Sequence, residues 1–260
     1  MNVLTTRVAL RERSIAEVFD LAFRFMVVRG GAVYRRLWLL SCLPPLLACI
    51  ALRLYRVEWL WVWSVAVAGF VIAQIPFTLA ASRLLLGDEL PLGGLVKTWL
   101  ARIPGQLLMH AVVVGVLGAT SFVIFPVPFL MARFLYLPEI ALLEGSGLVR
   151  AYERGTRFTN QRFSLALETL VLLAVVLGCF VLGAEITGSA IVEDLLSLPA
   201  LDDSLFETGG SWFSLFGFFA SVPLLATARF LTYIDVRTRR EAWDVQLRFT
   251  ELAKDPRGAT

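Results

Sequence analysis

The chain has 260 residues, of which 58% are hydrophobic and 17% are charged, and its mean hydropathy is +0.74. A water-soluble domain of this length needs more polar residues to cover its surface, so the composition excludes an ordinary soluble protein. The net charge of +3 is too small for the field of a nucleic-acid-binding protein, so no nucleic-acid partner is expected. The composition instead favours a membrane protein whose main partner is the lipid bilayer.

Six apolar stretches have about the ~20 residues that a helix needs to cross a bilayer. The first contains Pro44-Pro45, which predicts a kink or a late helix start. Pro126 alone separates the third stretch from the fourth, with Pro128 just beyond, which predicts a tight helical hairpin. The sequence therefore predicts an all-α membrane bundle of about six transmembrane helices, in chain order Leu37–Leu54, Trp59–Ala81, Leu107–Phe125, Val127–Leu143, Phe163–Glu185 and Trp212–Tyr233.

Three amphipathic segments are expected to form cytoplasmic helices at the membrane surface. Ser14 and Glu17 form a capping-box pattern that starts the first, and Gly30-Gly31 ends it. Similar segments run from Leu92 to Ile103 and from Leu148 to Phe158. The order of surface helix, span, span occurs three times, which predicts a threefold repeat. We expect a single integral-membrane domain over residues 1–250 and a flexible cytoplasmic tail over residues 251–260.

Basic residues are concentrated on one side of the predicted spans. Seven precede the first span, three lie between the second and third, four between the fourth and fifth, and six follow the sixth, so 20 of the 24 Lys and Arg are on this side. The positive-inside rule places this side, with both termini, in the cytoplasm of a bacterial inner membrane. The loop between the fifth and sixth spans, expected outside, has no basic residue and carries Glu193, Asp194, Asp202, Asp203 and Glu207.

Four charged residues inside the predicted spans are candidate site residues. Arg133 is costly in the fourth span and is therefore a candidate anion site, the alternative being a structural pair with Glu185. Glu168 and Arg229 lie at matching depths, so we expect them to face one another or to extend to the surface. His110, the single histidine, has no partners in the sequence for metal or nucleophilic chemistry. No catalytic residue, metal or cofactor is expected.

Basic residues on the cytoplasmic side are candidates for contacts with anionic lipid headgroups or with a protein partner. The alternative is that they only orient the chain, since some are spaced i, i+4 from acids, as Arg237 is from Glu241. The candidate residues are Arg150, Arg154, Arg157, Arg237, Arg239 and Arg240.

Small residues inside the spans are expected to serve packing. Cys42, Cys49 and Cys179 each lie in an apolar run and are interpreted as small buried side chains. Gly115 and Gly118 make one side of the third span small, which predicts the close approach of a neighbouring helix.

Three stretches of the chain together resemble a known family. They are Leu10-Arg11-Glu12-Arg13-Ser14 with Glu17-Val18-Phe19-Asp20, Ala22-Phe23 and Pro44; Arg133-Phe134-Leu135-Tyr136-Leu137-Pro138 with Leu143-Glu144-Gly145, Ala151 and Arg154; and Tyr233-Ile234-Asp235-Val236-Arg237 with Arg239-Arg240-Glu241 and Asp244. In order and spacing, from about Leu10 to Leu247, they resemble the glycerophosphoryl diester phosphodiesterase membrane-domain family and related bacterial inner-membrane proteins.

Some members of that family carry a soluble phosphodiesterase barrel, whereas most stand alone and have no assigned activity. Six spans leave no residues for a barrel in this chain. The resemblance therefore implies the membrane part alone, without phosphodiesterase activity, and it supplies no catalytic residue.

Two hypotheses for function follow. The first is a non-catalytic inner-membrane protein that acts as a scaffold, an assembly partner or a membrane-homeostasis factor, with a membrane or cytoplasmic protein partner. The alternative is a small transporter or lipid-binding protein that uses Arg133 as an intramembrane anion site.

Overall fold

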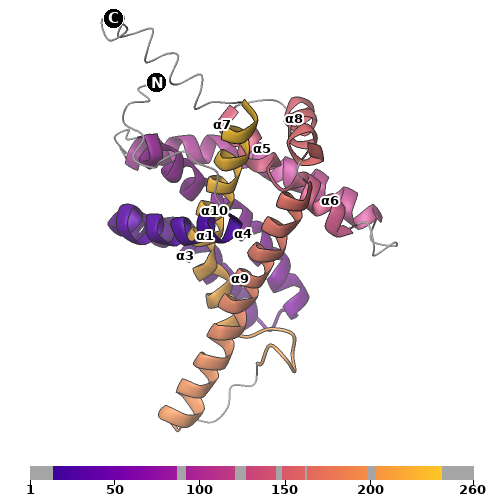
Figure 1. Cartoon of the computed structure of the whole chain (residues 1–260). Coiled ribbons are helices and arrows are strands. Elements are labelled where there is room, and N and C mark those ends of the chain that lie inside the picture. The colour runs from indigo at the N-terminus through magenta and orange to yellow at the C-terminus, as the bar shows by residue number, and fades with distance from the viewer. Residues whose placement is uncertain are drawn as a thin grey trace, which may run out of the picture.

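The computed structural model describes residues 14–86, 92–120, 127–144, 148–161, 163–197 and 203–241, and all regular elements in these ranges are helices (Figure 1). Five helical segments are long and apolar enough to cross a membrane: Ile15–Leu54, Trp59–Leu85, Gly93–Thr120, Phe163–Leu195 and Trp212–Thr238. The all-α class and the membrane-protein composition predicted from the sequence are confirmed at this level. The predicted tail, residues 251–260, lies outside the described residues.

The N-terminal segment consists of consecutive helices: α1 (Ile15–Arg24), the π-helix η2 (Phe25–Gly30), α2 (Gly31–Ser41) and α3 (Leu43–Leu54). Ser14 caps α1, and its Oγ accepts a hydrogen bond of 3.3 Å from the Glu17 N–H. Gly31 has a φ of +36°, a left-handed backbone conformation that favours glycine. The helix end predicted at Gly30-Gly31 is therefore observed as a break between η2 and α2.

Pro44 and Pro45 lie in the first turn of α3, where the missing N–H groups remove no helical hydrogen bond. The span is already helical in α2 before these prolines, so the structure shows an interruption of the helix at Cys42 and not a late start. After α3 the chain turns and continues as α4 (Trp59–Leu86).

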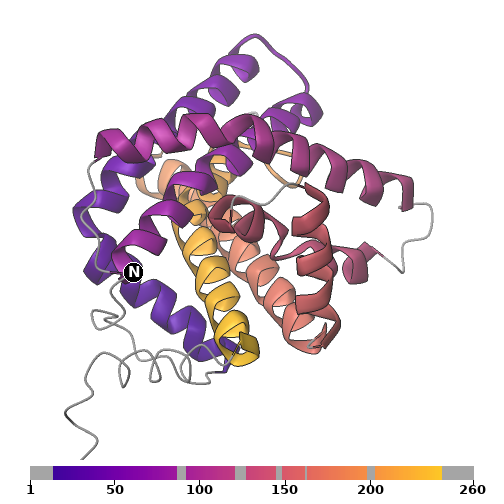
Figure 2. The ribbon, with the colours of Figure 1, turned by 90° about the horizontal axis from the view of Figure 1, so that it is seen from above.

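Helix α5 (Leu92–Thr120) joins two predicted elements, the second surface helix and most of the third span, and contains Pro104. In Figure 2 it runs across the bundle, in a different direction from α9 (Phe163–Ala190) and α10 (Trp212–Glu241). The prediction of close packing at Gly115 and Gly118 is wrong within the described chain, because a Cβ at either position would meet nothing within 4 Å.

The predicted fourth span is broken into two short helices, α6 (Val127–Phe134) and α7 (Leu137–Glu144). A turn at Leu135 and Tyr136 separates them, and Pro138 lies in the first turn of α7. The prediction of one continuous helix over this span is therefore wrong. The hairpin turn expected around Pro126 lies outside the described residues.

The third predicted surface segment is α8 (Leu148–Gln161). Helix α9, extended by the π-helix η3 (Ile191–Leu195), and helix α10 pack side by side and antiparallel (Figure 1). Gly217 of α10 touches α9 closely, since a Cβ there would overlap the Phe180 carbonyl oxygen and lie 2.7 Å from the Ala184 Cβ. Cys179, also on α9, is exposed, which corrects its interpretation as a buried side chain.

Helix α10 lies at the centre of the described bundle and takes part in both of its apolar clusters. One cluster joins α10 to α1 and α7 through residues such as Val18, Ile140 and Phe230. The other joins α10 to α2 and α4 through residues such as Leu37 and Phe219. Side chains of α10 therefore point into the interior of the bundle, and α4, α5 and α7 face the same interior.

Candidate binding site

A cavity of about 300 Å³ lies between α4, α5, α6, α7, α9 and α10. Its volume is at the lower end of the range for small-molecule sites, ~300–1,000 Å³. The wall is mostly apolar, which suits a hydrocarbon chain. The apolar lining residues are Phe70, Met109, Val113, Leu117, Met131, Phe134, Leu135, Pro138, Leu170, Leu173, Ala174, Leu177 and Leu225.

Three polar side chains complete the wall of this cavity: Gln74 of α4, His110 of α5 and Arg229 of α10. Arg229 donates a hydrogen bond from Nε to Oε1 of Glu139 of α7, so the two form an ion pair. The Glu139 side chain is fully buried, whereas 16% of the Arg229 side chain is exposed. The carboxylate therefore lies behind the guanidinium, and the cavity is bordered by hydrogen-bond donors.

A small void of about 10 Å³ lies behind Arg229, roughly the size that holds one water molecule. Gln74, Thr78, Gln106, His110 and Glu139 are among the residues that border it. Within the described chain, Oε2 of Glu139 has no hydrogen-bond partner. A buried carboxylate oxygen without a partner is costly, so this atom is an unsatisfied element of the site, as is the nearby Tyr136 hydroxyl.

Hydrogen bonds to the backbone hold the α5 side chains in place. Gln106 donates from Nε2 to the Pro138 carbonyl over 3.1 Å, which ties α5 to the start of α7. The His110 ring donates from Nδ1 to the Gln106 carbonyl over 2.8 Å, which leaves Nε2 as an acceptor when the ring is neutral.

The break in the fourth span is what positions Glu139. Because α7 starts again at Leu137, Glu139 falls in the first turn of a helix, where the backbone dipole favours a carboxylate. A continuous helix from Val127 would have placed Glu139 in a helix interior without this contribution.

The structure contradicts the predicted pairing of Arg229 with Glu168. Arg133 is exposed on α6 and does not line this cavity, and its role as an anion site stays a prediction. Arg229 pairs with Glu139 and not with Glu168, whose side chain is exposed on α9. Matching depth along two helices did not identify the partner, because it says nothing about the direction in which each side chain points.

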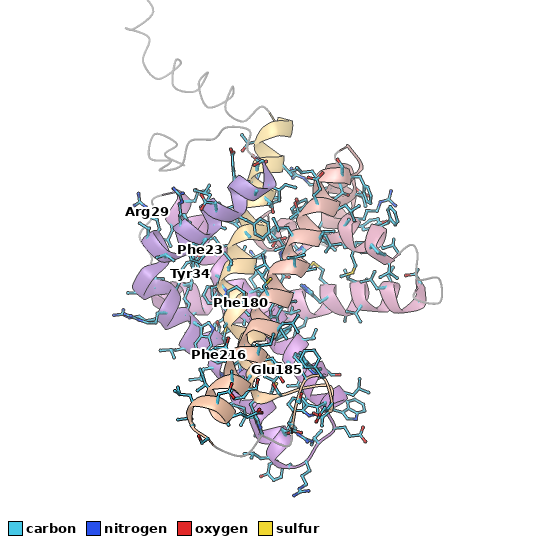
Figure 3. All side chains as sticks on the ribbon, turned by 60° about the horizontal axis from the view of Figure 1, so that its bottom comes forward. Phe23, Arg29, Tyr34, Phe180, Glu185 and Phe216 are labelled. Carbon is cyan, nitrogen blue, oxygen red and sulfur yellow. The ribbon has the colours of Figure 1, made fainter. Side chains whose placement is uncertain are left out.

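Glu185 does not pair with Arg133 either. Its Oε1 accepts a hydrogen bond of 2.9 Å from the Leu205 N–H, and its Oε2 accepts one from the Ser211 hydroxyl. Figure 3 places Glu185 toward one end of the bundle and Arg29 toward the other. Glu185 therefore anchors the segment that leads into α10.

Arg53 and Asp203 attach the same segment to the turn between α3 and α4. The Arg53 guanidinium donates to both carboxylate oxygens of Asp203, from Nε to Oδ2 over 2.7 Å and from Nη2 to Oδ1. The Trp59 indole donates to Oδ1 over 3.3 Å. Hydrogen bonding from Arg53, and then from Trp59, holds the pKa of Asp203 below its ordinary value, against the opposing effect of burial.

Three of the predicted cytoplasmic contact residues, Arg150, Arg154 and Arg237, do not line the cavity. Arg150 and Arg154 are exposed on α8, and Arg237 of α10 donates to the Tyr233 hydroxyl over 3.4 Å. The side chains of Arg157, Arg239 and Arg240 lie outside the described residues. A role of these residues in binding lipid or a protein stays a prediction.

Sequence analysis missed Glu139, although the signal was present. An acidic residue inside a predicted span, here Val127–Leu143, is by itself a candidate site residue. Gln74, Thr78 and Gln106 carried a weaker signal, because uncharged polar side chains are common in membrane helices.

Among the described side chains, no group of three or more His, Cys, Asp and Glu could hold a metal ion. No family model, curated protein or solved structure matches this chain. The resemblance to the glycerophosphoryl diester phosphodiesterase membrane-domain family therefore stays a prediction. The candidate site stands on its own geometry.

Proposed function

We propose that this protein binds an amphipathic molecule with an anionic headgroup, the headgroup at Arg229 and the hydrocarbon chain in the apolar cavity. One observation carries the proposal: an arginine held from behind by a buried carboxylate borders a cavity that is otherwise almost entirely apolar. An arginine is a strong donor to carboxylate, phosphate and sulfonate oxygens, and its strength increases where water is excluded. Apolar walls with a few placed polar groups are typical of small-molecule sites.

The proposal replaces Arg133 by Arg229 in the second of the two hypotheses from the sequence. It is a binding or transport function, and it assigns no catalytic step and no cofactor. A scaffold function would depend on a docking surface for a partner protein, and the cavity provides no support for such a surface.

We further propose that the chain crosses a bacterial inner membrane six times, with both termini in the cytoplasm. In addition to the five long apolar helices, the fourth predicted span is supplied by α6 and α7 together. The segregation of 20 of 24 Lys and Arg supports the even number of crossings. A helix broken next to a cavity is common in membrane transporters, since the freed backbone groups are buried in protein. The threefold repeat and the family resemblance belong to the same proposal.

Binding is tested with the protein in nanodiscs of phosphatidylcholine, titrated with dodecanesulfonate and, as the uncharged match, dodecanol. We expect saturable binding of dodecanesulfonate about tenfold to a hundredfold tighter than of dodecanol, the range given by one charge-assisted hydrogen bond. The double variant Arg229→Gln with Glu139→Gln removes both charges and should lose this preference. The control Arg133→Gln should keep it.

Equal affinity for the two probes, or an unchanged preference in the double variant, would overturn the proposal. A second set of nanodiscs contains phosphatidylglycerol. If this lipid displaces dodecanesulfonate, the natural ligand class is a bilayer lipid; if it does not, the class is a single-chain amphiphile.

A further inference from the structure

We infer that the site takes up one proton, on Oε2 of Glu139, for each anionic headgroup that binds at Arg229. The inference rests on the proposed function and adds a coupling to it. Two observations carry it: Oε2 has no partner although Glu139 is fully buried, and Glu139 and the binding arginine both border a void of about 10 Å³.

Charge balance gives the first reason. The pair of Glu139 and Arg229 is neutral as a unit, and a bound anion would leave the buried site with a net charge of −1. A net charge in a water-poor interior is costly and is usually removed by protonation. Glu139 and neutral His110 are the described groups in the site that can gain a proton, and the Glu139 carboxylate is the one with an oxygen that lacks a partner.

Geometry gives the second reason. The ion pair uses Nε of Arg229 and Oε1 of Glu139. The terminal amino groups of Arg229 carry four further N–H donors, enough for a sulfonate or phosphate group. A proton on Oε2 would not break the contact at Oε1, and it would turn the unsatisfied oxygen into a hydrogen-bond donor. Acceptors line the same void, among them the Gln106 side-chain amide and Nε2 of neutral His110.

The groups that face Glu139 favour this assignment. Arg229 lies on α10, His110 on α5, and the neutral phenol Tyr136 at the break before α7. Helix α4 contributes the uncharged Gln74 and Thr78. Helix α8 also packs on α7, but its described charged side chains, those of Arg150, Glu153 and Arg154, are exposed.

One proton from the solvent forms an O–H bond at Oε2, one anion forms hydrogen bonds to Arg229, and the total charge of the site does not change. The void of about 10 Å³ that Glu139 and His110 both border has room for about one water molecule.

Calorimetry with dodecanesulfonate tests the coupling, because this probe stays anionic at every pH used and any proton taken up must be the protein's. Titrations at one pH in two buffers of different ionisation enthalpy give the number of protons bound. We expect about one proton per probe in the wild type, and an affinity that falls by up to about tenfold for each unit of rising pH.

The variant Glu139→Gln should bind the probe without proton uptake and without this pH dependence. Glu168→Gln, which changes an exposed carboxylate on α9, should behave as the wild type. An infrared difference spectrum should show the carbonyl band of a protonated carboxylic acid on binding, absent in Glu139→Gln. If that variant does not fold, the wild-type proton count and spectrum still decide.

Binding without proton uptake in the wild type would overturn the coupling and leave the proposed function standing. Uptake that persists in folded Glu139→Gln would also overturn it. No binding of the probe at all would overturn the proposed function and the coupling together.

Discussion

Arg229 of α10 and Glu139 of α7 form an ion pair across 90 positions of sequence. The carboxylate is fully buried, and the guanidinium borders the apolar cavity between α4, α5, α6, α7, α9 and α10. This pair joins the central helix of the bundle to the broken fourth span, so it connects the stability of the fold to the candidate binding site.

Removal of one partner from this pair should destabilise the protein strongly, because it leaves the other charge buried and unpaired. We expect Glu139→Ala to cost about 3–5 kcal/mol, and Glu139→Gln combined with Arg229→Gln to cost clearly less than the sum of the two single changes. Unfolding of the detergent-solubilised protein by denaturing detergent measures both.

The exposed pair Asp20 and Arg24 is the matched control, since 59% and 73% of the two side chains are exposed. When Asp20 and Arg24 are replaced singly and together in the same way, the interaction free energy between them should be about 0.5 kcal/mol or less. A similar interaction free energy for the two pairs would contradict the burial of the pair formed by Glu139 and Arg229.

The bond between Arg53 and Asp203 should make stability depend on pH. The pKa of Asp203 is lower in the folded than in the unfolded chain, where it is about 3.9. Its contribution is therefore fully present above about pH 5 and is lost as the pH falls through the folded pKa. Thermal unfolding from pH 7 to pH 3 should show Asp203→Asn less stable than the wild type at pH 7, with the difference shrinking at acidic pH.

Glu207→Gln is the control for this series, because Glu207 is an exposed acid of the same segment. It should follow the wild-type curve at every pH. A constant gap between wild type and Asp203→Asn down to pH 3 would show that the ion pair is not what the substitution removes.

Contact between α9 and α10 should depend on Gly217. The change Gly217→Ala places a methyl group against the Phe180 carbonyl oxygen and Ala184, so the two helices must separate. We expect a loss of about 1–3 kcal/mol in the unfolding assay, typical of overpacking. Gly115→Ala, where a Cβ meets nothing within 4 Å, should be neutral or slightly stabilising.

The proposed topology predicts which residues a membrane-impermeant maleimide can label in intact cells. Cys179 is exposed on α9 and is first replaced by serine, whereas Cys42 and Cys49 are buried. In this background Glu207→Cys should react from outside, and Glu153→Cys on α8 should react only after the cells are permeabilised. Labelling of both from the same side would show that α9 does not cross the membrane and would refute the proposed topology.

The sequence was sufficient for properties that depend on local composition. The apolar length of Phe163–Glu185 predicted a spanning helix because the transfer of side chains into lipid adds up residue by residue. Ser14 predicted a helix start, and the Pro44-Pro45 pair predicted a kink or a late start, because capping and the missing proline N–H act within one turn.

Only the tertiary structure decided which charges meet. Arg133 and Arg229 are both arginines in apolar segments, yet one is exposed on α6 and the other borders the cavity. The partner of Arg229 depends on the rotation of α10 and on the break at Leu135 and Tyr136, which together set where Glu139 points. Those features result from packing between helices far apart in the chain, and no local pattern of apolar and polar residues encodes them.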